Sequence, residues 1–198
     1  MRIDLLSELV AAFDTGDDHA ASKSRELVLG LLAHTTAPLS RDQFEPGHIT
    51  ATGLVLHPER DAVLLIHHAR LDRWLLPGGH IEPGDSEISE SARREVLEET
   101  GATLLADGPA PLIGIDVHGI PPRTKAGTGK REPFHLHHDL VFALRASSGV
   151  IESREEVRAA LWQDLADLRT NPYHLPQNIR LSAQRAIRVL GSRGSSFH

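Results

Sequence analysis

The chain has 198 residues, of which 24% are charged and 40% hydrophobic. These proportions are typical of one globular domain with an extension and exclude a disordered chain. The net charge of -6 offers no basic surface to a nucleic acid polymer, although it does not exclude a small phosphorylated ligand that binds with a metal ion. Because the chain has no cysteine, disulfides, thiolate catalysis and cysteine-ligated zinc are excluded.

Two amphipathic helices are expected at the N-terminus, over residues 3–14 and 20–34, because apolar residues recur there at helical spacing. Acidic residues interrupt the first pattern, so it does not predict a signal peptide. No apolar run approaches the roughly 20 residues of a membrane-spanning helix. We therefore expect a soluble, cytoplasmic protein in which a helical extension (1–45) packs on a main domain (46–190) and a disordered tail (191–198) follows.

The main domain alternates between expected strands and helices. Apolar and β-branched segments predict strands at 49–56, 62–66, 111–120 and 134–146, the first two forming a hairpin. A short strand and a Gly/Pro loop cover 73–85, and a second loop covers 121–133. Helical periodicity predicts helices at 86–100, 155–167 and 177–190. For the first of these helices, Asp85 or Ser86 is the expected N-cap and Gly101 the expected end. Mixed elements in this order favour an α/β or α+β fold.

The helix at 86–100 carries an unusual concentration of acids. At about 100° per residue, Glu95, Glu98 and Glu99 share an arc of roughly 100° that borders the apolar stripe expected to meet the core. Like charges in that position repel one another and lose hydration unless a cation lies among them. Mg²⁺ suits carboxylate ligands, so the helix predicts a metal site. The alternative is a solvated face on which Arg94 forms surface ion pairs.

The loop before this helix favours the metal site. Leu76-Pro77-Gly78-Gly79, followed by Arg94-Glu95-Val96-Leu97-Glu98-Glu99-Thr100-Gly101-Ala102, resembles the signature of the Nudix hydrolases: Gly, five residues, Glu, seven residues, then Arg-Glu-aliphatic-x-Glu-Glu-x-Gly-aliphatic. The second half matches, with Ala102 at the last position. The first half departs twice, because Asp85 stands where the family has Glu and eight residues separate it from Arg94. We interpret this as a one-residue insertion where the loop meets the helix.

The resemblance covers about residues 46–170 and implies the family's αβα sandwich with a mixed sheet. It implies an enzyme that uses water and Mg²⁺ or Mn²⁺ to cleave a diphosphate in a nucleotide-type substrate. By this likeness, Glu95, Glu98, Glu99 and the Gly79 carbonyl bind the metal. Arg94 orients the acids, and either Glu95 or Glu98 accepts a proton from water. Gly78, Asp85 and Gly101 hold structural positions of the motif.

A histidine-rich strand provides further candidates. Alternation places His135, His137 and Asp139 on one face, which predicts contact with a substrate or binding of a metal. His118 is a weaker candidate for the same substrate contact. The alternative is a half-exposed strand whose polar residues bond to neighbouring loops.

Two other functions share the fold. A non-catalytic Nudix-like module that binds nucleotides or regulates a partner is less favoured, because such modules tend to lose the acids that this chain keeps. Isopentenyl-diphosphate isomerase uses a cysteine, which this chain lacks. Nucleoside triphosphates, nucleotide sugars and dinucleotides remain open as substrates. No membrane or nucleic acid polymer is expected as a partner, and a homodimer is compatible with the sequence.

Overall fold

The computed structural model describes residues 1–106, 108–124, 127, 129–154 and 157–191. Its helices are α1 (Ile3–Ala11), α2 (His19–His34), α3 (Ile88–Thr100), η1 (Leu165–Arg169, a 3-10 helix) and α4 (Gln177–Leu190). Its strands are β1 (Gly47–Leu56), β2 (Ala62–His68), β3 (Arg73–Leu75), β4 (Gly78–His80), β5 (Leu112–Ile120), β6 (Arg123–Thr124), β7 (Arg131–Glu132), β8 (His135–Arg145) and β9 (Val157–Asp164).

Seven of the strands form one mixed sheet. Its main order is β3-β2-β1-β8-β5, while β4 pairs with β1 and β9 pairs with β2. Strands β1 and β8 are parallel, from Gly47 opposite Leu136 to Leu56 opposite Arg145, and the other pairs in this sheet are antiparallel. The expected mixed α/β fold is therefore confirmed.

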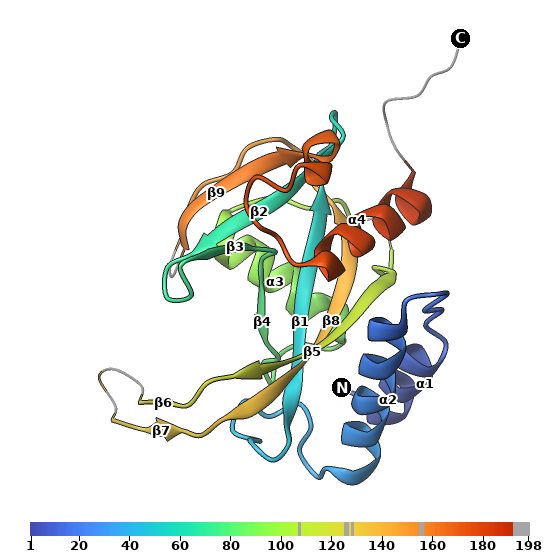
Figure 1. Cartoon of the computed structure of the whole chain (residues 1–198), viewed down its shortest axis with the longest axis vertical. Coiled ribbons are helices and arrows are strands. Elements are labelled where there is room, and N and C mark those ends of the chain that lie inside the picture. The colour runs from blue at the N-terminus through green and yellow to red at the C-terminus, as the bar shows by residue number, and fades with distance from the viewer. Residues whose placement is uncertain (107, 125–126, 128, 155–156, 192–198) are drawn as a thin grey trace.

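Alternation along β1 divides the core between the two faces of the sheet. Ile49, Ala51 and Val55 pack in the cluster that includes α3 and the N-terminal helices. Leu54 and Leu56 pack in the cluster that includes α4. The sheet thus has helices on both faces, with α3 behind β1 and α4 in front of it in Figure 1. Its curled strands leave the lower end of β1 and β8 outside the cover of α4.

Helix α3 ends as predicted and begins later than predicted. Gly101 adopts a left-handed conformation (φ 61°) and its N–H donates to the Leu97 carbonyl, which closes the helix. The predicted N-cap was wrong, because Glu87 occupies that position without a side-chain cap. Asp85 does not cap because its carboxylate accepts hydrogen bonds from Ser91 and Arg94 instead.

The helix predicted at 155–167 was wrong. Residues 157–164 form β9, antiparallel to β2 with Leu161 opposite Leu65, and η1 follows. Ala159, Ala160 and Leu161 favour a helix locally, but pairing with a strand distant in the sequence overrides that preference. Within the predicted loop 121–133, the short strands β6 and β7 pair with each other. The tail predicted at 191–198 lies outside the described residues, apart from Gly191.

Helices α1 and α2 pack on the sheet rather than standing apart. Their apolar side chains, including Val10 and Leu31, belong to the same core cluster as Leu140 of β8. The Arg185 guanidinium of α4 also pairs with Asp18 just before α2, at 3.1 Å. None of the described helices is long and apolar enough to cross a membrane.

Candidate active site

Two of the three acids predicted to bind metal, Glu95 and Glu99, contact strand β4. Gly79 of β4 pairs with Ala51 of β1, which brings the strand against α3. A side chain on Gly79 would place its Cβ 2.6 Å from the Glu95 carboxylate carbon, so the glycine leaves the space that this carboxylate occupies. The Gly78 N–H donates to Glu99 Oε2 at 3.0 Å. The glycine loop and the acidic helix therefore meet at two backbone positions.

Arg94 contacts four groups of the motif. Its Nη1 donates to Glu95 Oε1 at 2.9 Å and to Glu98 Oε2 at 3.0 Å. Its Nε and Nη2 donate to the two oxygens of Asp85 at 3.2 and 3.1 Å. Nη2 also donates to the His80 carbonyl at 2.8 Å. One guanidinium thus connects the segment before α3, the acidic face of that helix and the end of β4. The planar guanidinium can do this because its N–H donors point in several directions.

Asp85 reaches Arg94 despite the additional residue in the motif. Burial raises the pKa of Asp85, but hydrogen bonds from Arg94 and Ser91 outweigh burial and leave its pKa below the ordinary value. Helix α3 starts only at Ile88, so Asp85 lies in the segment before it and pairs with Arg94 from there.

The three glutamates differ in exposure. Glu99 is buried, with 8% of its surface exposed, while the Glu98 side chain is 39% exposed. Burial raises the pKa of Glu95, and the hydrogen bond from Arg94 opposes this. Their oxygens, beside a glycine that leaves space at Glu95, are the hard donors that fit Mg²⁺ or Mn²⁺. Arg94 lies between Glu95 and Glu98, so the acids converge on the guanidinium in this arrangement.

The structure brings together three of the four residues predicted to contact substrate. The rings of His135 and His137 have centroids 5.4 Å apart, and His118 lies 5.7 Å from His137. His118 Nδ1 also bonds to Asp116 Oδ2 at 2.8 Å, and this bond raises the pKa of His118. His135 is 3% exposed.

Asp139 is occupied by contacts within the sheet. The hydroxyls of Thr50 and Thr52 both donate to Asp139 Oδ1 at 2.9 Å, which ties β1 to β8. Burial raises the pKa of this carboxyl, while nearby His118 and the threonine hydroxyls oppose the rise. For Asp139, these bonds favour the alternative interpretation of the histidine-rich strand, in which its polar residues bond to neighbouring segments instead of contacting a substrate.

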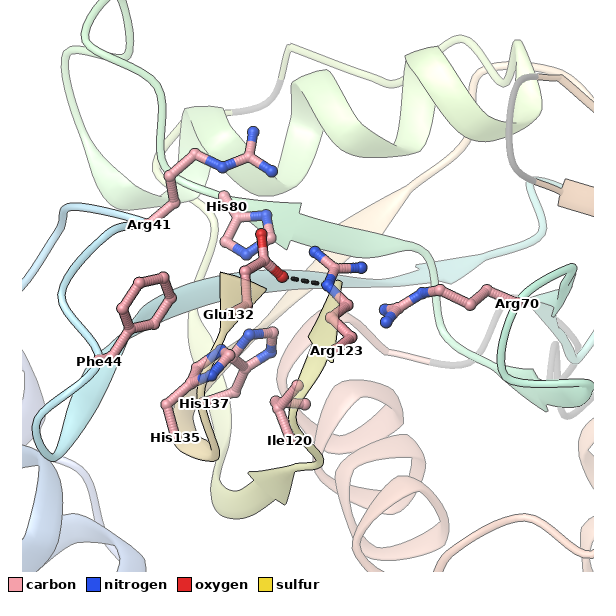
Figure 2. A pocket seen from close by; sticks show the side chains of 9 residues that line it. All are labelled: Arg41, Phe44, Arg70, His80, Ile120, Arg123, Glu132, His135 and His137. Carbon is pink, nitrogen blue, oxygen red and sulfur yellow. Dashed lines mark hydrogen bonds and ion pairs between the residues drawn. The ribbon is translucent and has the colours of Figure 1, made fainter. Parts of the chain in front are cut away.

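Sequence reasoning missed His48 and His80, which lie beside His137 with ring centroids 4.9 and 5.3 Å from it. It also missed Arg41 and Arg123, which line a small cavity with His80 and His137 (Figure 2). The sequence signal that could have located His48 was the alternation of side chains along a strand. His48, Thr50 and Thr52 share one face of β1, as His137 and Asp139 share one face of β8. Using it required the register of β1 against β8, in which His48 lies opposite His137.

Comparison with known proteins identifies the family. The sequence profile of the NUDIX domain matches residues 47–184. The chain is 34% identical over 125 residues to an 8-oxo-(d)GTP phosphatase of Mycolicibacterium smegmatis, a match that covers 63% of this chain and 33% of the relative. It is 28% identical over 119 residues to the nucleoside triphosphatase NudI of Escherichia coli, covering 60% of this chain and 77% of NudI.

A solved NUDIX-family hydrolase from Clostridium perfringens shares the fold, with a TM-score of 0.52 and 24% identity over 72% of this chain and 97% of that one. The family profile covers most of the chain, so the chain belongs to the Nudix family and the resemblance seen in Arg94–Ala102 is confirmed. The matched segment spans about a third of the mycobacterial relative's length.

Proposed function

We propose that this protein is a metal-dependent Nudix pyrophosphohydrolase that cleaves a diphosphate linkage in a nucleotide-type substrate. The observation that carries the proposal is the Arg94 contact set, in which one guanidinium binds Asp85, Glu95 and Glu98 beside the glycines of β4. A purely solvated acidic face would not require Glu95 to pack against Gly79 or Glu99 to be buried against the Gly78 N–H.

Glu95, Glu98, Glu99 and the Gly79 carbonyl would hold Mg²⁺ or Mn²⁺. When bound, the metal screens phosphate charge and lowers the pKa of a water molecule. Glutamate side chains have three rotatable bonds, so Glu98, which is more exposed than Glu99, can turn from Arg94 toward an ion. The acids of α3 supply oxygen donors only, which favours magnesium or manganese over softer metals.

The chain's own residues would orient and deprotonate the attacking water. Arg94 restrains Glu95 and Glu98 by charge-assisted hydrogen bonds, and Asp85 restrains Arg94 from the other side. One of these two glutamates accepts the proton of the water. Glu95 is restrained further by its contact with Gly79, while Glu98 has the freedom to approach solvent.

The substrate class is inferred from the relatives and from the site. One relative is named a phosphatase of 8-oxo-(d)GTP and another a nucleoside triphosphatase, which favours a nucleotide here. His118 is half-buried at the sheet end, and we retain it as a substrate contact. Cytoplasmic location and a homodimer stay predictions.

A substrate panel tests this function. Nucleoside triphosphates, including 8-oxo-dGTP, would be compared with nucleotide sugars and dinucleotides in the presence of Mg²⁺ or Mn²⁺, with release of phosphate and pyrophosphate measured. We expect hydrolysis of at least one class, loss of activity on chelation, and recovery when the metal is returned. Failure of the whole panel by protein with metal bound would contradict catalysis and favour a nucleotide-binding module.

A further inference from the structure

Four histidines meet on the sheet face opposite the acids of α3. His48 is on β1, His80 on β4, and His135 and His137 on β8. The ring centroid of His48 lies 4.9 Å from that of His137, 5.2 Å from that of His135 and 5.1 Å from that of His80. Figure 2 shows His80, His135 and His137 turned toward the same small cavity. Strands distant in the sequence therefore place imidazoles around one point.

Two of these rings have their tautomers fixed by backbone carbonyls. His48 Nδ1 lies 2.9 Å from the Gln43 carbonyl and His135 Nδ1 lies 2.8 Å from the Pro133 carbonyl. Because a carbonyl only accepts, each Nδ1 must carry the proton, and each neutral ring then has its lone pair on Nε2. A backbone carbonyl that orients the far nitrogen is the usual support of a metal-binding histidine.

In the described part of the chain, no group donates a hydrogen bond to the lone pair on His48 Nε2. His48 is 1% exposed, and its Nε2 is buried without a hydrogen-bond partner. A satisfied core histidine would have a donor at this atom, because an unpaired buried polar atom costs about 1–3 kcal/mol. An electron-pair acceptor beside Nε2 would remove that cost.

We propose that His48, His135 and His137 form a binding site for a borderline divalent transition metal of the Zn²⁺ class, separate from the carboxylate site. One donor atom from each residue lies within 4.8 Å of the others. Tetrahedral zinc at about 2.0–2.1 Å from nitrogen needs donors about 3.3 Å apart, so small ring rotations complete the geometry. Imidazole nitrogens select such a metal, whereas Mg²⁺ prefers the oxygen donors on α3.

The surroundings indicate an anionic fourth ligand. The adjoining cavity, about 20 Å³, is lined by His80, Arg41 and Arg123, among others, and this volume suits about one water-sized group. Arg123 pairs with Glu132, which moderates the positive charge beside the site. Three neutral imidazoles leave the dication's charge uncompensated, so a hydroxide or phosphate oxygen facing the arginines completes the coordination. In this proposal, His135 and His137 bind the metal instead of contacting the substrate directly.

Zinc binding by the full chain tests the site. The protein would be titrated with Zn²⁺ against a chromophoric chelator, with excess Mg²⁺ present to occupy the oxygen site. We expect one Zn²⁺ per chain, and Co²⁺ should give the visible absorption of a tetrahedral nitrogen site. His48→Gln and His137→Gln should each weaken Zn²⁺ binding by about 100-fold or more. His137 is only half-buried, so its variant remains informative if the buried His48 variant fails to fold.

Matched controls separate this site from the acids and from surface histidines. His34→Gln, on the exposed end of α2, and Glu98→Gln should both leave zinc binding unchanged. The proposal is overturned if the wild-type chain takes up no Zn²⁺, if folded His137→Gln still binds it normally, or if Glu98→Gln abolishes binding. Binding of inorganic phosphate at these histidines without any Zn²⁺ uptake would equally overturn it, in favour of a metal-free anion site.

Discussion

Arg94 explains how a motif with an unusual first half retains its geometry. Its five N–H donors reach Asp85, Glu95, Glu98 and the His80 carbonyl. Sequence spacing predicted that Glu95, Glu98 and Glu99 share one face, because they lie on one helix with a fixed period. The pairing of Arg94 with Asp85 could be seen only in the structure, because spacing alone does not show how a loop accommodates an additional residue.

Asp85→Asn tests the ion pair at the scale of one residue. The Asp85 side chain is 8% exposed and the Arg94 side chain 20%, so the loss of this charge-assisted pair should lower the free energy of unfolding by about 2 kcal/mol at neutral pH. Denaturant unfolding at pH 7 measures this. Chelator-treated protein should be used, so that metal affinity does not enter the result.

The pH dependence of that loss follows from the lowered pKa of Asp85. A depressed carboxyl pKa contributes stability above the unfolded-state value, about 3.9, and that contribution disappears as pH falls through the folded-state value. The difference between wild type and Asp85→Asn should therefore be constant from pH 7 to pH 5 and shrink below about pH 4. A difference that instead grows in acid would contradict the ion pair.

At the scale of elements, the approach of α3 to β1 depends on Gly53. A Cβ there would lie 2.6 Å from Val96 Cγ2 and 2.9 Å from Leu144 Cδ1. Gly53→Ala should therefore destabilise the fold by about 1–3 kcal/mol, the typical cost of overpacking a core. Thermal or denaturant unfolding checks the value.

Gly30→Ala is the matched control for this substitution. Gly30 lies inside α2 with nothing within 4 Å of a Cβ position, so alanine should stabilise the helix by about 0.5–1 kcal/mol. The same Gly→Ala change should therefore destabilise the protein at position 53 and stabilise it at position 30. Equal effects at both positions would mean that α3 and β1 are not in close contact.

The elements that sequence predicted well were those with a local signal. Helix α3 ends at Gly101 because glycine adopts the left-handed conformation there at little cost. Strand β9 was not predicted, because its residues favour a helix and only pairing with β2 makes it a strand. The histidine cluster was not predicted either, since His48 and His137 become neighbours only through the register of β1 and β8.

At the scale of the whole molecule, the N-terminal helices should behave as part of the folded domain. Leu31 of α2 is 3% exposed and packs in the central cluster, whereas Leu27 on the same helix is 43% exposed. Leu31→Ala should cost about 3 kcal/mol, and Leu27→Ala less than about 1 kcal/mol. Both are measured by chemical unfolding of the full chain. Small, equal losses at the two positions would show that the extension is only loosely attached.

If the acidic face of α3 is catalytic, Glu98→Gln should remove activity without disturbing the fold. On the best substrate of the panel, with saturating Mg²⁺, this variant should lose about 100-fold or more in kcat while its far-UV spectrum and unfolding midpoint stay near those of wild type. Glu90→Gln, on the same helix but exposed and bonded to Ser86, should stay within about twofold. A folded Glu98→Gln variant that hydrolyses substrate at the wild-type rate in a metal-dependent manner would show that this acid is not part of the catalytic site.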